Sequence, residues 1–414
     1  MRQERGRLDA AWLGEATLSE LLAALDCAGE EARVVGGVIR NTLLGDPPGD
    51  IDIATTALPP EVIKRVEAAG FKAVPTGIEH GTITVIAAGR PFEVTTLRED
   101  VETFGRRAKV AFGRDWKRDA ERRDFTMNAL SASRDGTLYD YVGGLTDIAA
   151  RRVRFIGDAT SRIAEDYLRI LRFFRFHAAY GAGAPDPEGV AAAIAGRAGL
   201  ELLSRERIRM ELLKLLAARR AAEAAVIMTE SGLLAQVLGT VPLLASFAAM
   251  IKLEAVLGLP PDPVRRLGAL SVSITEDADR LRARLRTTNA EYERLGSMGD
   301  GWWQVSSAWE EQRARILLYR LGHERFTDRV LLAWARSSEG AANAAWHALA
   351  TLPMRWAVPA FPLRAVDFIK RGLPKGPRLG AALAAAEEAW TAAGFPLDSA
   401  ALAAIADAAG AQAK

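Results

Sequence analysis

The sequence predicts an α+β protein in which a small mixed α/β domain precedes a long helical region. In the first third of the chain, short runs of β-type residues alternate with turn signals and with helical spacing. From about Ser161 onward the apolar residues follow helical spacing almost without a break, and Gly and Pro mark the turns. A chain of 414 residues exceeds what one hydrophobic core usually serves. Two or more domains are therefore expected.

The elements of the first third are expected in a definite order. Apolar residues at helical spacing predict a helix within residues 8–28. Five strands follow, at Arg33–Val35, Asp50–Thr55, Phe71–Val74, Thr82–Ala87 and Pro91–Leu97. Helices are expected after Gly37 and after Pro59-Pro60, because proline suits a first helical turn. A charged loop from Arg98 to Arg123 and a last strand at Leu138–Val142 complete this part.

Composition excludes several classes of protein. The single cysteine, Cys27, excludes an intramolecular disulfide framework and a Cys-ligated zinc site, and it suits a reducing compartment. No His-Asp pair and no HExxH pattern stands in the chain, which argues against common His-based metal sites. With 54 Lys and Arg against 52 Asp and Glu, the formal charge is +2, and this average does not suggest a nucleic-acid binder.

Neither an export signal nor a membrane span is predicted. Residues 1–12 carry charges where a signal peptide needs an apolar run, so we expect a cytoplasmic protein. Between Glu230 and Lys252 lie 21 uncharged residues, but Pro242 would remove a helix hydrogen bond at their middle. This stretch therefore predicts two buried helices joined by a Gly-Thr-Val-Pro turn.

The sharpest local signal is a strand that runs into a Gly-Gly turn and a helix, at residues 34–41. A turn of this kind exposes backbone N–H groups of Gly36 and Gly37 at the positive end of a helix, which suits a phosphate. Arg40, one turn later, can add a fixed cation. This is not a P-loop, because no Gly-Lys-Ser/Thr follows.

Paired carboxylates follow this turn. Asp50 and Asp52 are separated by one residue of a β-type run, so their side chains should leave the same face. Two like charges so close favour a cation between them, and Mg²⁺ binds carboxylate and phosphate oxygens together. The alternative interpretation is an edge strand with two solvated acids. Glu93, in a later strand, is either a third carboxylate of the site or a plain surface acid.

A second signal is the run from Arg122 to Ala129. Arg122 and Arg123 offer cations for a triphosphate, while Asp124 and Asn128 offer hydrogen-bond partners for a ribose. The alternative is a charged helix start with Asp124 as its N-cap. Taken alone, the run is compatible with both interpretations.

A third signal places charged residues three apart, at Asp166, Arg169, Arg172 and Arg175, in a drifting stripe along one helix. Such a stripe often means salt bridges on a wet face, for example between Glu165 and Arg169. The functional interpretation is that a carboxylate accepts from the exocyclic amine of cytosine or adenine, while guanidinium groups donate to ring acceptors. Uracil or guanine would present a carbonyl to the carboxylate and be rejected.

Five motifs together resemble the class II tRNA nucleotidyltransferases. The motifs are GGVIR with DIDIATT, RRDFTMNAL, DYVGGLTD, IGD with RIAEDYLRILRFFRF, and SRERIRMELLKLL. They cover roughly residues 30–220, in the order found in this family of CCA-adding enzymes and poly(A) polymerases within the polymerase-β superfamily. The resemblance implies an α+β fold, with a small mixed-sheet nucleotidyltransferase head followed by an all-α neck, body and tail. The corresponding boundaries are residues 1–133 for the head, 134–222 for the neck, and 223–414 for a tRNA-binding body and tail.

The resemblance also implies roles for individual residues. Asp50 and Asp52 would bind Mg²⁺ and carry catalysis, with Glu93 as a third candidate. The nucleotide-binding set comprises Gly36, Gly37, Arg40, Arg123, Asp124, Asp166, Arg169, Arg172 and Arg175. Within it, the glycines and Arg40 would hold the triphosphate, Arg123 and Asp124 would serve phosphate and ribose, and Asp166 and Arg169 would read the base with Arg172 and Arg175 beside them. Glu206 and Arg207 match a helical motif that braces the neck.

Two departures from the family pattern stand out. Asn41 replaces a common Asp, which alters the loop but not a metal ligand. Phe104 stands before Gly105 where an acid is frequent, in a loop thought to help the switch from C to A addition; alternatively, Phe104 packs this loop down. By contrast, residues 75–82 look like the CCA-adding branch, and the Gly-Arg-Arg/Lys-Phe pattern of poly(A) enzymes is missing there.

The expected function is therefore template-independent addition of C, C and A to the 3′ end of tRNA from CTP and ATP. Two metal ions would assist attack of the 3′-hydroxyl, and pyrophosphate would leave. The alternatives are a poly(A) polymerase or a partial, CC- or A-adding enzyme of the same family, a catalytically inactive RNA-binding protein, and a small-molecule nucleotidyltransferase. No protein partner is inferred.

Local charge fits an RNA substrate better than the average does. Residues 106–123 contain eight Lys and Arg against three acids, and residues 151–220 contain fourteen against eight. Positive charge is thus concentrated in the loop and the neck, where an RNA backbone would lie.

Overall fold

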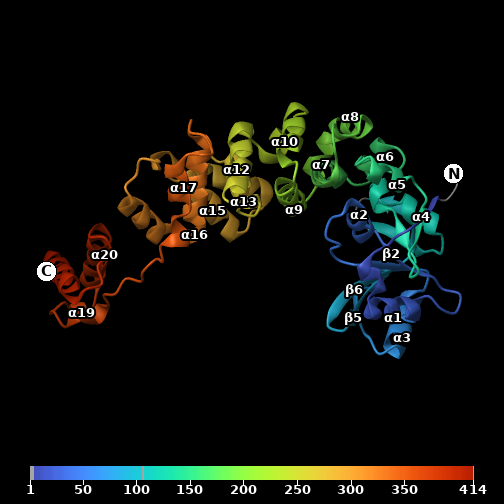
Figure 1. Ribbon diagram of the computed structural model, residues 1–414, viewed down its shortest axis with the longest axis horizontal. Helices are drawn as coiled ribbons and strands as arrows, with labels where there is room; N and C mark the ends of the chain where they lie inside the picture. Colours follow the sequence, from blue (N-terminus) through green and yellow to red (C-terminus); the bar gives the residue numbers. More distant parts are fainter. Residues whose placement is uncertain (1–3, 105–106, 414) are drawn as a thin grey trace. The chain divides into compact units, whose positions relative to one another are not determined.

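The chain forms two compact units, residues 1–240 and 241–414, each described here by itself. The computed structural model describes residues 4–104 and 107–413, without the side chains of residues 4–5, 99–104 and 107–111 (Figure 1). None of the helices in this described part is both long and apolar enough to cross a membrane. The predicted α+β class, a mixed sheet followed by helices, is confirmed.

An eight-stranded mixed sheet forms the centre of the head. Its strand order is β1-β10-β9-β2-β3-β6-β5-β4, and all neighbours are antiparallel except the parallel pair β3 and β6. The strands are β1 (Glu4–Arg7), β2 (Ala32–Val35), β3 (Asp52–Thr55), β4 (Lys72–Gly77), β5 (Thr82–Ala87), β6 (Arg90–Thr96), β9 (Ser131–Ala132) and β10 (Thr137–Asp140). The six expected strands are all present: β5 has the predicted ends, the other five have shifted ends, and β1 and β9 were not predicted.

Helices of the first unit cover the sheet and continue beyond it. The α-helices are α1 (Ala16–Leu25), α2 (Gly37–Leu44), α3 (Pro59–Ala68), α4 (Trp116–Glu121), α5 (Gly144–Ala149), α6 (Ala159–Glu165), α7 (Leu168–Tyr180), α8 (Pro187–Ala195), α9 (Arg205–Leu216), α10 (Ala221–Glu230) and α11 (Leu233–Leu238). Short 3₁₀ helices are η1 (Ala11–Gly14), η2 (Ile78–His80), η3 (Thr126–Asn128) and η4 (Arg197–Leu202). The helices expected after Gly37 and at Pro59-Pro60 are confirmed as α2 and α3. The predicted boundary near residue 133 falls just before β10, which pairs in the head sheet; the division into three domains stays a prediction.

The prediction of a charged loop from Arg98 to Arg123 was wrong. Its backbone forms an antiparallel hairpin of β7 (Arg98–Phe104) and β8 (Arg107–Phe112), followed by α4. Asp115 caps α4 by accepting from the N–H groups of Lys117 and Arg118. The pairing depends on backbone groups, so the run of charged side chains concealed it. The Phe104 side chain and residues 105–106 lie outside the described part of the chain, so the expectation about this loop stays a prediction.

The DYVGGLTD motif is structural in this chain. The buried carboxylate of Asp140 accepts from the N–H groups of Val142, Gly143 and Leu145, which folds the turn before α5. Asp147, with no exposed surface, accepts from the Thr126 hydroxyl at 2.6 Å and pairs with Arg152 and Arg154. These bonds tie the segment before β9 to the chain that leads into α6.

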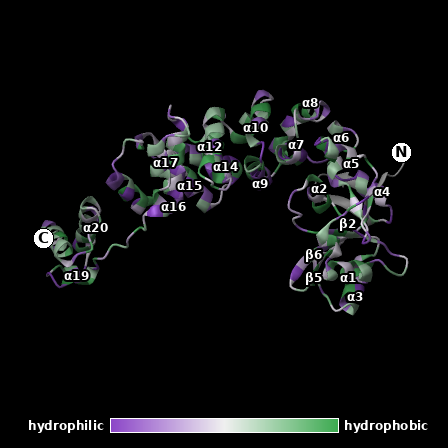
Figure 2. Ribbon diagram, in the orientation of Figure 1, coloured by the Kyte–Doolittle hydropathy of each residue, from purple (hydrophilic) through white to green (hydrophobic). Residues whose placement is uncertain are grey.

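Within the described residues of the second unit, all regular secondary structure is helical. Its helices are α12 (Leu244–Val256), α13 (Pro263–Ser271), α14 (Glu276–Leu285), α15 (Asn289–Gly299), η5 (Trp302–Gln304), α16 (Glu311–Arg336), α17 (Ala344–Ala350), α18 (Leu352–Arg355), α19 (Ala365–Ile369), α20 (Pro377–Ala392) and α21 (Ser399–Gln412). Hydrophilic and hydrophobic residues alternate along these helices (Figure 2). The uncharged stretch around Pro242 forms α11 and α12 joined at residues 239–243, so the two expected helices are confirmed.

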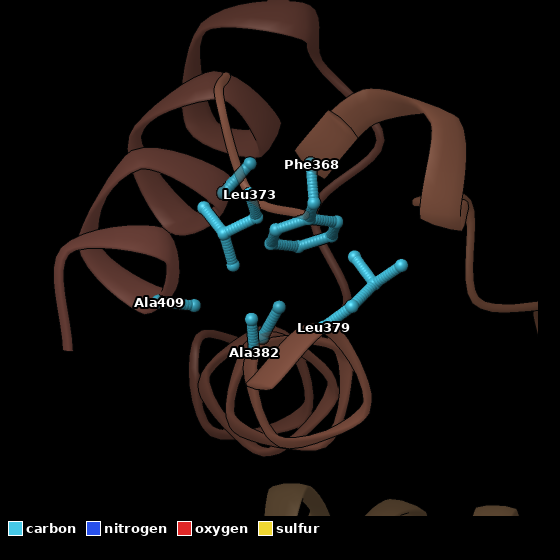
Figure 3. Close-up of a cluster of buried hydrophobic side chains, with 7 residues drawn as sticks. Phe368, Leu373, Leu379, Ala382 and Ala409 are labelled. Carbon is cyan, nitrogen blue, oxygen red and sulfur yellow. The ribbon is translucent and has the colours of Figure 1, made fainter. Parts of the chain in front are cut away.

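Helices α19, α20 and α21 enclose a small core rich in alanine (Figure 3). Phe368 and Leu373 lie in one buried cluster with Ala382 and Ala409, and the short alanine side chains suit the close packing of α20 against α21. Tyr319 on α16 packs edge-on against Trp390 of α20 at 5.5 Å between ring centroids. The predicted helical character of the Ala-rich end is confirmed.

Candidate functional site

A hollow of about 450 Å³ in the first unit gathers most of the predicted nucleotide-binding residues. Its wall comprises Gly36, Gly37, Arg40, Asp52, Arg123, Asp124, Asn128, Asp166, Arg169, Arg172 and Phe176. Four segments that are far apart in the sequence thus meet here: the start of α2, the start of β3, the RRDF segment, and the α6–α7 region. The predicted residues Asp50, Glu93 and Arg175 do not line this hollow.

The floor begins at the turn between β2 and α2. Gly36 has φ +75°, which is strained for residues with a side chain, and a Cβ there would lie 3.4 Å from Nη1 of Arg123. At Gly37, a Cβ would lie 3.5 Å from Nη2 of Arg40. Guanidinium nitrogens of Arg123 and Arg40 thus lie close to the two glycines at the N-terminus of α2, where backbone N–H groups favour an anion.

Arg40 is almost completely buried, with 6% of its surface exposed. Its Nη1 donates to Oδ1 of Asn128 at 2.5 Å, and its Nη2 donates to Oδ1 of Asn41 at 2.7 Å. Burial lowers the pKa of Arg40. The Nδ2 group of Asn41 donates to the carbonyl of Pro47 at 3.0 Å, a bond that the Asp common in the family could not make.

Asp52 opens β3 and faces Glu93 across the parallel pair β3–β6. Asp52 is exposed to solvent, yet partial burial of its carboxylate by the surrounding protein raises its pKa to about 6. The negative charges of Glu93 and Asp50 also raise this pKa, and the positive charge of Arg123 lowers it. Glu93 lies with Asp52 and Arg123 on a second hollow of about 210 Å³. The register thus places Glu93 beside Asp52 on the neighbouring strand.

Asp50 lies just before the strand rather than in it. The prediction of a continuous strand from residue 50 was wrong, because β3 begins at Asp52. Asp50 is exposed, but it is near enough to influence the pKa of Asp52. Among residues whose side chains are described, no group of three or more His, Cys, Asp or Glu is arranged to hold a metal ion.

Arg122 and Arg123 are held by a residue that sequence reasoning missed. The buried carboxylate of Asp119 accepts from Nε of Arg122 at 2.8 Å and from Nη2 of Arg123 at 3.1 Å. Burial alone would raise the pKa of Asp119, but the two guanidinium charges outweigh it and the pKa is lowered. The signal in the sequence was an acid three and four residues before two arginines on a short helix. Arg162 also donates to the carbonyls of Arg122 and Arg123.

Asp124 is not a helix N-cap, so the structural alternative for this run was wrong in that respect. Its Oδ1 accepts from the N–H of Phe125 at 2.8 Å and from Nδ2 of Asn128 at 3.0 Å, and its Oδ2 accepts from Nε of Arg172 at 2.8 Å. Burial would raise the pKa of Asp124, but Arg172 and these hydrogen bonds lower it. Asp124 therefore couples the RRDF segment to α7 at the wall of the hollow.

The charged stripe does not lie on one helix, as had been predicted. Helix α6 ends at Glu165, Asp166 has an extended backbone, and α7 begins at Leu168. The carboxylate of Asp166 accepts from the N–H of Leu168 at 3.1 Å and from Nη2 of Arg207 at 2.6 Å. Arg207 thus braces Asp166 from α9, whereas Glu206 on the same helix is exposed.

The arginines of the stripe have ion-pair partners. Arg169 pairs with Glu165, as the structural interpretation expected, and donates to the carbonyl of Arg162 at 2.7 Å. Arg175 lies 2.6 Å from a carboxylate oxygen of Glu211 on α9 and packs over the ring of Phe176. Glu211 was missed, although its spacing from Ile208 and Leu212 puts it on the apolar face of α9.

Comparison with known proteins agrees with this arrangement. Residues 32–154 match the family model of the poly A polymerase head domain, and residues 186–247 match that of the probable RNA- and SrmB-binding site of polymerase A. The human "CCA tRNA nucleotidyltransferase 1, mitochondrial" is 35% identical over 89% of this chain and 84% of its own length. The "CCA-adding enzyme" of Limosilactobacillus fermentum is 31% identical over 88% of this chain and 89% of its own.

Solved structures show the same fold. The Bacillus stearothermophilus CCA-adding enzyme in complex with CTP has a TM-score of 0.73 and 30% identity, and the similarity covers 91% of this chain and 92% of that chain. The Thermotoga maritima CCA-adding enzyme complexed with tRNA has a TM-score of 0.68 at 18% identity, which bears on the fold alone. With the motifs, the site and these relatives in agreement, the chain belongs to the CCA tRNA nucleotidyltransferase family.

Proposed function

We propose that the protein adds C, C and A to the 3′ end of tRNA from CTP and ATP without a nucleic-acid template. The observation that carries this proposal is the single hollow in which the α2 N-terminus, Asp52, Arg123 and Asp166 meet. Relatives named CCA-adding enzymes, one of them solved with CTP, support the choice of substrates. The relative solved with tRNA is similar in fold and supports the partner.

We propose Mg²⁺ as the metal, with Asp50 and Asp52 as its ligands and Glu93 as a third candidate; among the described side chains, no group of three acids is arranged to hold an ion without further ligands. Two observations support this choice. The candidate ligands are carboxylate oxygens, which Mg²⁺ prefers, and the strand register sets Asp52 opposite Glu93. When bound, the ions would stabilise the charge that develops on the attacking hydroxyl and on the departing pyrophosphate.

The protein's own groups would bind and orient the substrates. The N–H groups of the α2 turn, with Arg40 and Arg123, would hold the triphosphate, and Asp124 would hold a ribose hydroxyl. Asp166 would accept from the exocyclic amine of cytosine or adenine while Arg169 donates to the ring, with Arg172 and Arg175 supporting them. A carboxylate has about four acceptor positions, so the bonds to Leu168 and Arg207 leave capacity for a base.

The test is sequencing of the products after reaction with tRNA that ends at the discriminator base, at CC-less and A-less stages. A three-nucleotide extension that stops is expected. Long A tracts on unrelated RNA would instead indicate a poly(A) polymerase, extension by C alone or A alone would indicate a partial enzyme, and no incorporation of labelled CTP would indicate an inactive RNA-binding protein.

Two variants connect this activity to the site. Asp52→Asn should keep the fold and lower kcat by orders of magnitude, while the matched change Asp9→Asn at an exposed acid of the same unit should leave kcat unchanged. Asp166→Ala should mainly erode discrimination against UTP and GTP. Normal turnover of the first variant would remove Asp52 from the chemistry, and unchanged selectivity of the second would move base recognition elsewhere.

The predicted division into head, neck, and body with tail remains part of this proposal, with the body and tail as the tRNA-binding region. The cytoplasmic location also stays a prediction, since similar proteins of human and mouse are named mitochondrial.

A further inference from the structure

The guanidinium of Arg40 is held by a residue that does not line the hollow. Tyr180, the last residue of α7, accepts from Nη2 of Arg40 at 2.8 Å through its hydroxyl. The ring of the same tyrosine lies under the guanidinium, 3.9 Å from its central carbon to the ring centroid. Arg40 lines the hollow and Tyr180 lies behind it, so the tyrosine fixes both the plane and the direction of the cation.

Tyr180 is itself held in place from several directions. Its ring packs against Phe176 at 5.5 Å between centroids. The preceding carbonyl, that of Ala179, accepts from Nη2 of Arg219 at 2.9 Å. Arg219 also binds both carboxylate oxygens of Asp46, at 3.0 and 3.1 Å, in the loop that follows α2. The end of α7 is therefore fastened to the helix that carries Arg40.

We propose that Tyr180 is a positioning residue for nucleotide binding, which orients the Arg40 guanidinium toward the triphosphate of CTP or ATP. This inference rests on the proposed function. An arginine side chain loses rotational freedom about several bonds when it becomes fixed. A partner that fixes it before the nucleotide binds therefore reduces the entropy cost of nucleotide binding. Because the triphosphate is common to both substrates, Tyr180 should affect CTP and ATP equally and leave base selectivity unchanged.

The experiment compares Tyr180→Phe, which keeps the ring and removes the hydroxyl, with Tyr180→Leu, which removes both. Binding of CTP, ATP and pyrophosphate is measured by calorimetric titration of the full-length protein, and incorporation kinetics are measured on tRNA. Loss of a hydrogen bond to a charged group predicts an increase in Kd of about tenfold for Tyr180→Phe, similar for all three probes. Tyr180→Leu should raise Kd further. The KM for nucleotide should rise with Kd, while kcat at saturating nucleotide and the KM for tRNA stay near their wild-type values.

The matched control is Tyr319→Phe in the second unit, where the hydroxyl donates to Glu387 and the ring packs against Trp390. It should leave every nucleotide Kd unchanged. Equal nucleotide and pyrophosphate affinity in wild type and Tyr180→Phe would overturn the proposal, as would a loss of tRNA affinity or of thermal stability that accounts for the whole effect. The binding measurements do not need turnover, so a protein that binds CTP without extending tRNA would refute the proposed function and still test Tyr180.

Discussion

The buried imidazole of His177 should make the first unit lose stability between pH 8 and pH 5. His177 lies on α7 with 2% of its surface exposed, and its Nε2 has no hydrogen-bond partner among the described residues. Burial lowers the pKa of His177 from 6.5 to about 4, the nearby Arg220 adds to this, and Glu223 opposes it. The imidazole is thus neutral in the folded protein at pH values where it is charged in the unfolded chain.

The sign follows from proton binding. Between pH 6.5 and 4 the imidazole of His177 holds a proton in the unfolded chain but not in the folded chain. Its contribution to the free energy of unfolding is therefore fully present well above pH 6.5 and falls as the pH is lowered toward 4. Linkage over this range gives a loss of about 2 kcal/mol between pH 8 and pH 5 from this one group. His177→Gln should remove that part of the pH dependence, whatever its effect on stability at pH 8.

The assay is urea unfolding followed by circular dichroism at both pH values, with hydrogen exchange of the α7 amides to assign the transition to the first unit. The exposed His323, changed to Gln, is the control and should keep the wild-type pH dependence. If His177→Gln loses as much stability between pH 8 and pH 5 as wild type, the imidazole is either charged or solvated in the folded protein, and the reasoning fails.

Other substitutions test packing and buried charge. Gly199→Ala should destabilise the first unit by about 1–3 kcal/mol, because the new Cβ would lie 2.1 Å from the Tyr167 ring, whereas Gly380→Ala, in an exposed turn of α20 with no atom within 4 Å, should stabilise α20 by about 0.5–1 kcal/mol. Thermal denaturation distinguishes the two, and equal effects would contradict the packing argument. Asp328→Asn should cost about 2–3 kcal/mol, because it removes a buried charge that Arg265 and Arg294 share even though Glu254 and Asp262 still pair with them. Asp407→Asn at an exposed ion pair should cost less than about 1 kcal/mol. Similar urea midpoints for these two variants would refute the role of the buried pair.

The sequence patterns that correctly predicted elements of the fold were those that act through local backbone geometry. The Gly-Gly turn before α2 and Pro59-Pro60 before α3 predicted helix starts, since these residues act through their own backbone geometry. The hairpin of β7 and β8 was missed because β7 is dominated by charged residues without apolar alternation and β8 alternates over only a few residues. The break at Asp166 escaped because neither Gly nor Pro marks it; the Asp166 carboxylate instead binds the N–H of Leu168 and starts a new helix.

The nucleotide hollow was predictable where a motif supplied the residues and was missed where tertiary contacts did. Asn128 and Phe176 both stood in motifs that had been singled out, but Phe176 had been given no role in the site. Asp119 and Glu211 do not line the hollow; they hold arginines that do or that support it. The spacing of Asp119 from Arg122 and Arg123 indicated its partners, whereas the pairing of Glu211 with Arg175 could not be identified before α7 and α9 were placed. Charge pairing across elements depends on distances that spacing along one element does not contain.

The parallel pairing of β3 and β6 has a consequence for how this chain can change. Asp52 and Glu93 lie side by side because β3 and β6 are aligned residue by residue. The segment between these strands passes through α3, β4 and β5. Added or lost residues in the turns of that segment leave the alignment intact. One residue inserted within β6 before Glu93 would instead turn its carboxylate to the opposite side of the sheet. Length variation should therefore be tolerated between the two strands and selected against inside them.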